Sequence, residues 1–410
     1  MPIGILGGGG GAISIDSQVI VKQASDLSGI LDSTKIYFID GIIDMGTQSI
    51  EVPATGLNLI GGTFDVSQLV SSADNYTMFT SPVGGSGNLL GQDIGLTTSG
   101  TGSKVYDLTD ATGFNAFEFQ RVNYNNCTSL GDIYNYRQGL EDGTGRFGAS
   151  PSLTLHGTWV GGFRITTSIV RGMSDTTTEP LFKAGTAFVM NSRFLTDINC
   201  DLGTLQPFAD FTPAMFPNPS TIQVQNGIFT RDSALNNNDA NIFPNLTYAD
   251  LACDWKGNLG LNNTYVGGKL NNSVQLETVI NTTGTAEDLN GTFTGIDLQH
   301  FDSPANGRLR HLGIKPHEFS VSWDFVIEGK NNDNYELFLI KIDTLANVTV
   351  ELAQVRTVNN LQGGRDVGIW SGVTSVTLNQ GDLLLWQVAN LLDTDNCTLE
   401  LDSAWVVQER

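Results

Sequence analysis

The stretch Glu318-Phe-Ser-Val-Ser-Trp-Asp-Phe-Val-Ile-Glu328 alternates apolar and polar residues along its whole length. Successive side chains of a β-strand point to opposite faces of the sheet, so Phe319, Val321 and Trp323 would share one face. Polar turns follow, and further apolar runs come at 335–342, 348–352, 376–388 and 399–407. Short strands at this spacing, separated by Gly, Asn and Asp, predict an antiparallel sandwich near the C-terminal end.

Two of these runs, 335–342 and 383–386, are apolar on both faces. A strand of an antiparallel sandwich usually packs one face in the core and turns the other toward water. The surplus apolar face therefore predicts burial against a partner subunit, and residues 276–410 are expected to form an oligomerisation head. The residues expected at this interface are Phe338, Ile340, Leu383, Leu385 and Trp386.

Three stretches carry a resemblance to a known family: Gly363-Gly-Arg365, Val376-Thr-Leu-Asn-Gln-Gly-Asp382, and Asn390 followed by Thr394-Asp-Asn-Cys-Thr398. They resemble the trimeric jelly-roll heads of the tumour-necrosis-factor and C1q type that are found at the tips of phage fibres. The resemblance covers about the last quarter to third of the chain. It implies a jelly-roll head, a homotrimer and a place in a virion.

From residue 13 to about 275 the apolar runs are shorter, as in Lys35-Ile-Tyr-Phe-Ile-Asp-Gly41 and Leu57-Asn-Leu-Ile-Gly-Gly62. Such strands are too short to be stable alone, but stacking them as successive rungs buries the inward side chains of each against its neighbours. The pattern resembles right-handed parallel β-helices of the pectate-lyase and phage-tailspike type, and roughly 20 to 25 residues per rung would make about ten to twelve turns. The expected fold is thus all-β: a right-handed parallel β-helix shaft (13–275) followed by an antiparallel jelly-roll head (276–410), as a homotrimer.

The charge and the hydrophobicity of the sequence restrict which binding partners are expected. The formal net charge of −22 would repel nucleic acid and anionic membranes, so neither is expected as a partner. No apolar stretch approaches the roughly twenty residues that a membrane span needs, so no membrane insertion is expected.

The four cysteines, Cys127, Cys200, Cys253 and Cys397, form no CxxC or Cys/His cluster, so we expect no disulfide, no metal and no cofactor. Free thiols fit assembly in a reducing host cytoplasm before incorporation into a virion.

Residues 1–12 combine a short apolar segment, Ile3, Ile5 and Leu6, with five consecutive glycines. One interpretation is a peptide that anchors the protein to capsid or tail proteins of a virion through these three side chains, with the glycines as a flexible tether. The other interpretation is a disordered terminus.

Two segments interrupt the rhythm of the rungs. Residues 131–150 are polar and glycine-rich, and residues 205–219 are rich in Phe and Pro. Aromatic rings suit sugar rings, so these segments predict exposed loops that contact a host-surface glycan or receptor, with packing between chains as the alternative. The candidate contact residues are Tyr134, Tyr136, Arg137, Phe208, Phe211 and Phe216.

Motifs for chemistry are sparse. Polysaccharide-cleaving enzymes work with two carboxylates, and Asp132 with Glu141 and Asp142 could supply them, but 43 acidic residues produce such pairs by chance. The histidines, among them His156, have no Ser/Asp or Cys partner nearby in the sequence. No catalytic residue is therefore assigned. The expected function is a non-enzymatic fibre or spike protein of a bacteriophage that attaches to the host cell surface. The alternatives are a tailspike depolymerase and a capsid decoration fibre.

Overall fold

The structure is a computed structural model, and it describes residues 17–148, 152–171, 177–231, 241–246, 250–261, 266–330, 333–356 and 367–409. Strands dominate these ranges, so the prediction of an all-β protein is confirmed. The chain divides into an N-terminal unit, residues 1–248 with 252–263, and a C-terminal unit, residues 249–251 with 264–410. The expected anchor residues Ile3, Ile5 and Leu6 lie outside the described residues.

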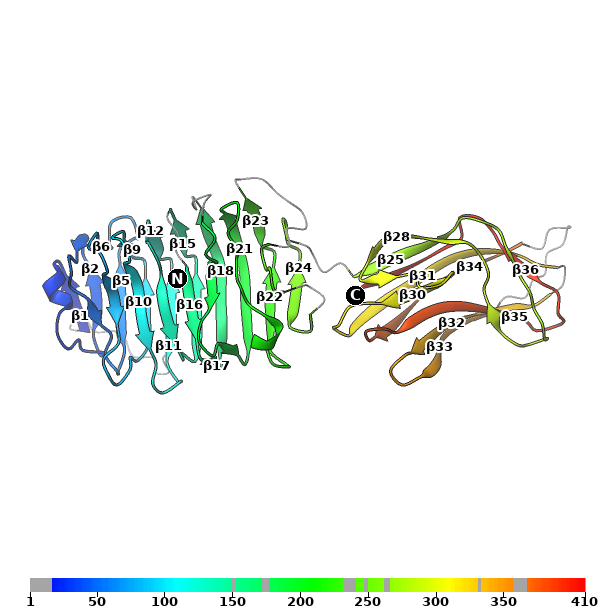
Figure 1. Cartoon of the computed structure of the whole chain (residues 1–410), viewed down its shortest axis with the longest axis horizontal. Helices are drawn as coiled ribbons and strands as arrows, with labels where there is room; N and C mark the ends of the chain where they lie inside the picture. Colours follow the sequence, from blue (N-terminus) through cyan, green and yellow to red (C-terminus); the bar gives the residue numbers. More distant parts are fainter. Residues whose placement is uncertain are drawn as a thin grey trace. The chain divides into compact units, whose positions relative to one another are not determined.

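Parallel strands build the N-terminal unit in three columns (Figure 1). The first column contains, in stacking order, β1 (Gln18–Val21), β2 (Ile36–Ile39), β5 (Leu57–Gly61), β8 (Leu89–Gln92), β11 (Ala116–Gln120), β14 (Gln138–Asp142), β18 (Gly162–Arg171), β21 (Arg193–Leu202), β22 (Thr221–Gln225) and β24 (Cys253–Lys256). The second contains β3 (Ile42–Asp44), β6 (Gln68–Ser71), β9 (Gly95–Thr98), β12 (Asn123–Asn125), β15 (Gly145–Phe147), the later halves of β18 and β21, and β23 (Ile228–Arg231).

The third column contains β4 (Ile50–Glu51), β7 (Thr77–Thr80), β10 (Lys104–Thr109), β13 (Gly131–Tyr134), β16 (Leu153–His156) and β19 (Phe182–Ala184). A short parallel pair, β17 (Thr158–Trp159) with β20 (Val189–Met190), and two 3-10 turns, η2 (Ala24–Leu27) and η3 (Pro213–Met215), complete the unit. From β2 to β16, consecutive strands belong to different columns, and each strand pairs with its counterpart one turn later. This arrangement fits the predicted parallel β-helix.

The number of residues per turn varies more than the sequence pattern predicts. Gln18 pairs with Ile36, a step of 18 residues, whereas Leu57 pairs with Leu89, a step of 32 residues. The segments between the strands account for most of this variation, and the pairing of β18 with β21 also shifts register between Thr166 and Ile169. Within the predicted segment 131–150, residues 131–148 are not a loop that interrupts the stack, because β13, β14 and β15 are ordinary strands of successive columns.

One residue per turn bends the chain sharply between the first and second columns. Asp93, Arg121, Gly143 and Thr167 occupy this corner in successive turns with φ of 55°, 49°, 61° and 50°. The Arg121 backbone N–H donates to the Asp142 carbonyl at 2.7 Å, and the Gly143 N–H donates to the Thr166 carbonyl at 2.8 Å. Left-handed backbone is unfavourable for L-residues, so hydrogen bonds to the next turn must hold the three non-glycine corners in place.

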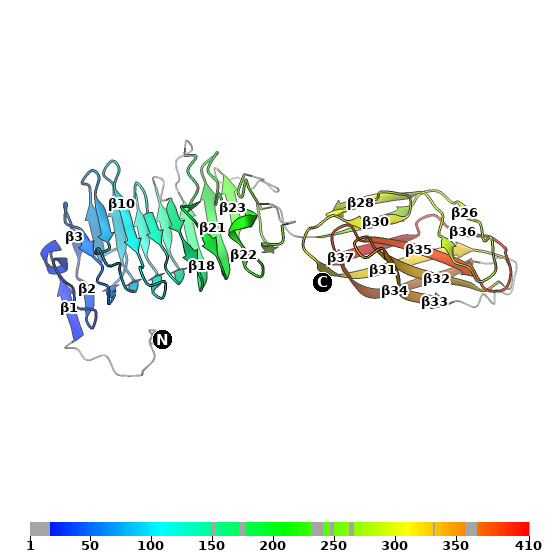
Figure 2. The same ribbon diagram turned by 60° about the horizontal axis from the view of Figure 1, so that its bottom comes forward.

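Antiparallel strands form two sheets in the C-terminal unit (Figure 2). The first sheet has the order β26 (Glu277–Thr278), β36 (Cys397–Leu399), β31 (His317–Glu328), β37 (Ala404–Glu409), β25 (Gly267–Asn272) and β28 (Phe293–Gln299), with β34 (Val367–Leu378) also paired to β31. The second has the order β29 (Phe301–Asp302), β30 (Arg308–His311), β35 (Leu383–Asn390), β32 (Tyr335–Asp343) and β33 (Val348–Arg356), with β27 (Glu287–Asp288) also paired to β35.

The two sheets pack face to face as a sandwich. The Trp323 and Trp386 ring centroids lie 4.8 Å apart, and those of Phe325 and Trp386 lie 5.1 Å apart. Phe319, Val321 and Trp323 share the inner face as the alternation predicts. The boundary between the units falls near residue 264, before the expected position at 275/276, because β25 pairs with both β28 and β37. Among the described residues, no helix has the length and apolar character to cross a membrane.

Candidate functional site

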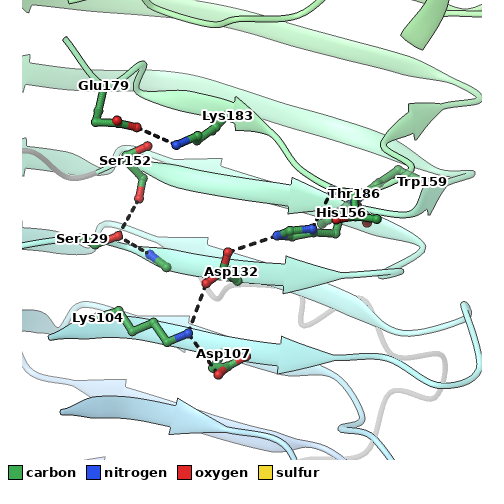
Figure 3. Close-up of polar contacts among 11 residues, drawn as sticks. Lys104, Asp107, Ser129, Asp132, Ser152, His156, Trp159, Glu179, Lys183 and Thr186 are labelled. Atoms are coloured by element: carbon green, nitrogen blue, oxygen red, sulfur yellow. Dashed lines mark hydrogen bonds and ion pairs between the residues drawn. The ribbon is translucent and has the colours of Figure 1, made fainter. Parts of the chain in front are cut away.

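A row of charged side chains crosses the outer face of the third column of the N-terminal unit (Figure 3). Parallel register places Asp107 of β10 opposite Asp132 of β13. The Lys104 ammonium lies 3.0 Å from the Asp107 carboxylate and 3.1 Å from the Asp132 carboxylate. One cation thus bridges two carboxylates that neighbouring rungs bring together, although they are far apart in the sequence.

The imidazole of His156 extends this row. Its Nε2 lies 3.0 Å from Asp132 Oδ1, and its Nδ1 accepts the Thr186 backbone N–H at 2.9 Å. Since Nδ1 accepts, the hydrogen-bond network assigns the proton to Nε2, which donates to Asp132. Tyr134 stacks on the ring with centroids 3.9 Å apart. Gly185 makes this placement possible, because a Cβ there would lie 2.2 Å from His156 Nδ1.

The electrostatics of the row favour fixed charges. Burial raises the pKa of Asp132, but hydrogen bonds from His156 and Lys104 outweigh it and hold that pKa below its ordinary value. Burial lowers the pKa of Lys104, but the hydrogen bonds to Asp107 and Asp132 outweigh it and raise the net pKa. Asp132 is therefore a carboxylate and Lys104 an ammonium at neutral pH.

This arrangement is poorly suited to acid–base chemistry. Glycoside cleavage needs a carboxylic acid that stays protonated near neutral pH, and Asp132 has the opposite shift. A general base needs a free nitrogen, and both ring nitrogens of His156 are engaged. Glu141, another candidate carboxylate, is 0 % exposed in the core and pairs with Arg146 at 2.7 Å. The row ties adjacent rungs together and offers charges and one aromatic ring for binding.

Most of the expected glycan-contact residues lie inside the N-terminal unit. Tyr136, Phe208 and Phe211 are 0 % exposed, and Phe216 is 4 % exposed. Phe208 packs against the rings of Phe182, Phe229 and Phe243, all with centroids 5.4 Å away. The prediction of exposed aromatic loops, and the alternative of packing between chains, are both wrong for these four residues, because their rings fill the coil of their own chain.

Two of the expected contact residues remain accessible. Tyr134 is half-buried beside His156, and Arg137 is exposed in the segment between β13 and β14. Tyr134 and Tyr136 are separated by a single residue, Asn135, which has a left-handed backbone with φ of 57°. The chain turns a corner here, so alternation along the sequence could not predict which tyrosine points inward.

The expected trimer-interface residues are mostly covered within one chain. Leu385 and Trp386 are each 3 % exposed and Ile340 is 6 % exposed, whereas Phe338 and Leu383 are half-buried. Trp386 points to the facing sheet, and Ile340 lies directly opposite Leu385 on the neighbouring strand. Leu385, Trp386 and Ile340 therefore cannot supply an exposed contact. The reasoning failed because cross-strand neighbours on the same sheet face bury part of each other's surface.

The first sheet carries two strongly exposed apolar side chains. Ile369 is 70 % exposed and Val373 is 68 % exposed on β34. They lie opposite Val326 and Ser322 of β31, on the face turned away from the sandwich core. Inspection of the sequence missed this face, although Ile369 and Val373 share one parity of 367–378 while the buried Trp370 and Val376 share the other.

Carboxylates also gather in the C-terminal unit. Among the described residues, Asp333, Asp393 and Asp395 are the group whose ligand atoms lie within 4.8 Å of one another, as a metal site would require. The Tyr335 hydroxyl donates to Asp333 at 2.8 Å, and the Lys330 ammonium pairs with Asp395. Burial raises the pKa of Asp333. The three carboxylates could hold a cation, but Lys330 already supplies positive charge to them.

Comparison with known proteins finds no matching family model and no matching curated protein. Solved structures with similarity include an Eiger TNF from S. frugiperda, with 11 % sequence identity and a TM-score of 0.29 over 36 % of this chain and 92 % of that chain. Murine APRIL at pH 8.5 has 6 % identity and a TM-score of 0.27 over 36 % of this chain and 100 % of that chain.

Proposed function

We propose that this protein is a non-enzymatic fibre of a bacteriophage virion that attaches the particle to the host cell surface. The N-terminal unit is a right-handed parallel β-helix that serves as the shaft, and the C-terminal unit is a jelly-roll head that holds three chains together. Residues 1–12 connect the fibre to capsid or tail proteins of the virion.

The proposal rests on the outer face of β31 and β34. Ile369 and Val373 stand exposed on a sheet whose inner face is already closed by the sandwich. On this face Ser371 and Asp324 lie between Ile369 and Val373, and the half-buried Val326 lies beside Ile369. Exposed aliphatic side chains of this kind are found at interfaces between proteins. In a homotrimer, this face would be buried in each of the three chains. The face replaces Leu385 and its neighbours as the expected contact.

The oligomeric state tests this proposal directly. Light scattering on the full-length protein should give a mass three times that of one chain. Ile369→Asp with Val373→Asp should reduce it to the mass of a single folded chain, because each subunit would then bury two carboxylates at the interface. Leu345→Asp is the matched control, since Leu345 is 81 % exposed at the turn between β32 and β33. A single-chain mass for the unmodified protein would refute the trimeric fibre.

The attachment role needs a separate experiment. The protein should bind to purified bacterial capsular or O-antigen polysaccharides. After incubation with the protein, the chain lengths of these polysaccharides should be unchanged. Shortened oligosaccharides would instead identify a tailspike depolymerase. Purified protein should also compete with infection by the virion that carries it, and failure to compete would favour a capsid decoration fibre.

A further inference from the structure

A groove of about 220 Å³ lies on the outer face of the first column of the N-terminal unit. Its lining comes from β2, β5, β8, β11 and β14, of which β2, β5 and β11 are labelled in Figure 1. The charged row of Figure 3 belongs to the third column, so the groove is a separate feature. Because each of these strands is one turn of the coil, the groove crosses several rungs at about 4.8 Å per rung.

The register of the strands sets the chemistry of the groove. Residues at alternate positions of each strand point outward, and parallel pairing aligns them in rows across the rungs. One row is Asn58, Leu90, Glu118 and Leu140, and the next contains Gln92 and Gln120. All six are half-buried. The rows combine amides and aliphatic side chains with one carboxylate.

Several polar groups in the groove remain available for a ligand. Within the part of the chain that the structure describes, the side-chain amides of Asn58 and Gln120, both of which line the groove, make no hydrogen bond to another residue. Gln138 donates to Glu118 Oε1 at 2.8 Å and thereby fixes the direction of that carboxylate. A carboxamide both donates and accepts hydrogen bonds, which matches hydroxyl groups that do the same. Leu90 and Leu140 add apolar contact surface beside these amides.

The charge of the groove lining further restricts the class of ligand that can bind. Among the described residues that line the groove, Glu118 is the only one with a charged side chain, and none is Lys or Arg. Recognition of carboxylate or phosphate groups normally uses Arg or Lys as donors. The net charge of −22 adds long-range repulsion of anions. An uncharged, hydroxyl-rich chain long enough to cross several rungs fits this lining.

We propose that the groove binds an uncharged polysaccharide, with Asn58, Gln120 and the Gln138–Glu118 pair as its hydrogen-bonding groups. The assignment names the ligand class for the attachment role proposed above and draws its biological meaning from that role. The site itself stands on the groove and its lining, and it does not depend on the oligomeric state.

Binding is measured with the full-length protein on an array of bacterial capsular and O-antigen polysaccharides, half of them neutral and half rich in uronic acid or phosphate. Asn58→Ala with Gln120→Ala should lower the affinity for a retained neutral polysaccharide at least tenfold. Gln223→Ala with Gln225→Ala is the matched control, because both glutamines are outward and half-buried on β22 of the same column but outside the groove. The control should bind within twofold of the unmodified protein.

A second variant, Leu90→Trp, fills the groove without removing an amide and should also abolish retention. Stronger retention of acidic than of neutral polysaccharides would overturn the assignment. So would a lack of retention across the neutral half of the array, or unchanged binding by the two groove variants. Retention with shortened chains would support the groove and refute the non-enzymatic function. Intact retention by a protein of single-chain mass would support the groove and refute the trimeric fibre.

Discussion

The guanidinium of Arg146 donates from Nη2 to Oε2 of Glu141 at 2.7 Å inside the coil of the N-terminal unit, where both side chains are at most 2 % exposed. Arg146 also lies 4.4 Å above the ring of Phe182. A charged pair at this depth is tolerated because each charge has a partner, and the loss of either partner leaves the other uncompensated.

Glu141→Gln should therefore lower the free energy of unfolding of the N-terminal unit by about 3–5 kcal/mol. Urea unfolding of the full-length protein measures this loss. The control is Arg121→Gln, which removes an ion pair with Asp93 at the surface, where the Arg121 side chain is 46 % exposed. That change should cost no more than about 1 kcal/mol. Equal losses for the two variants would contradict the buried placement of Glu141.

Gly185→Ala should destabilise the N-terminal unit by roughly 1–3 kcal/mol, because the new Cβ would collide with the His156 ring. The displaced ring would lose its hydrogen bonds to Asp132 and Thr186. Thermal unfolding reports the stability, and the NMR signals of the His156 imidazole report the displacement. Gly84→Ala meets no atom within 4 Å and should leave both measurements unchanged. An unperturbed imidazole in Gly185→Ala would disprove the contact.

Phe208→Ala should cost about 3–5 kcal/mol of stability, since it empties space between three aromatic rings in the coil. Phe114→Ala, at a side chain that is 78 % exposed, should cost less than about 0.5 kcal/mol. Calorimetry of both variants separates a core residue from a surface residue. A stable Phe208→Ala protein that had lost polysaccharide binding would restore the original expectation of a glycan-contact residue.

The C-terminal unit should lose stability as the pH falls from about 6.5 toward 4. Burial, followed by the neighbouring His311 and His317, lowers the pKa of His300 to about 4, and burial also lowers the pKa of His311. The unfolded chain then binds more protons than the folded chain in this range, so acid favours unfolding. Tm measured against pH should decline across this range.

His300→Asn is the variant for comparison, because Asn tolerates the left-handed backbone at this position, where φ is 55°. Its Tm should decline less between pH 6.5 and 4. Burial raises the pKa of Asp333, which acts in the opposite direction, so the quantity to compare is the difference between the two pH curves. Parallel curves would rule out a contribution from His300.

The alternation of residues 318–328 predicted β31 and its inward face correctly, because side-chain direction along a strand follows from local geometry. The short apolar runs of the first half likewise predicted stacked strands. The exposure of the candidate contact residues was predicted less well. Phe208 and Leu385 were expected at surfaces, yet each is at most 3 % exposed.

By itself, the sequence determined that the chain is all-β, that short parallel-type rungs precede an antiparallel sandwich, and which residues alternate along each strand. Only the tertiary structure decided that Phe208 lies inside the coil, that Ile369 and Val373 stand open, and that Lys104 reaches Asp132 on the next rung. The physical reason is that the alternation of apolar and polar side chains can be read from neighbouring residues in the sequence. Burial and charge pairing depend instead on side chains contributed by strands twenty to thirty residues away.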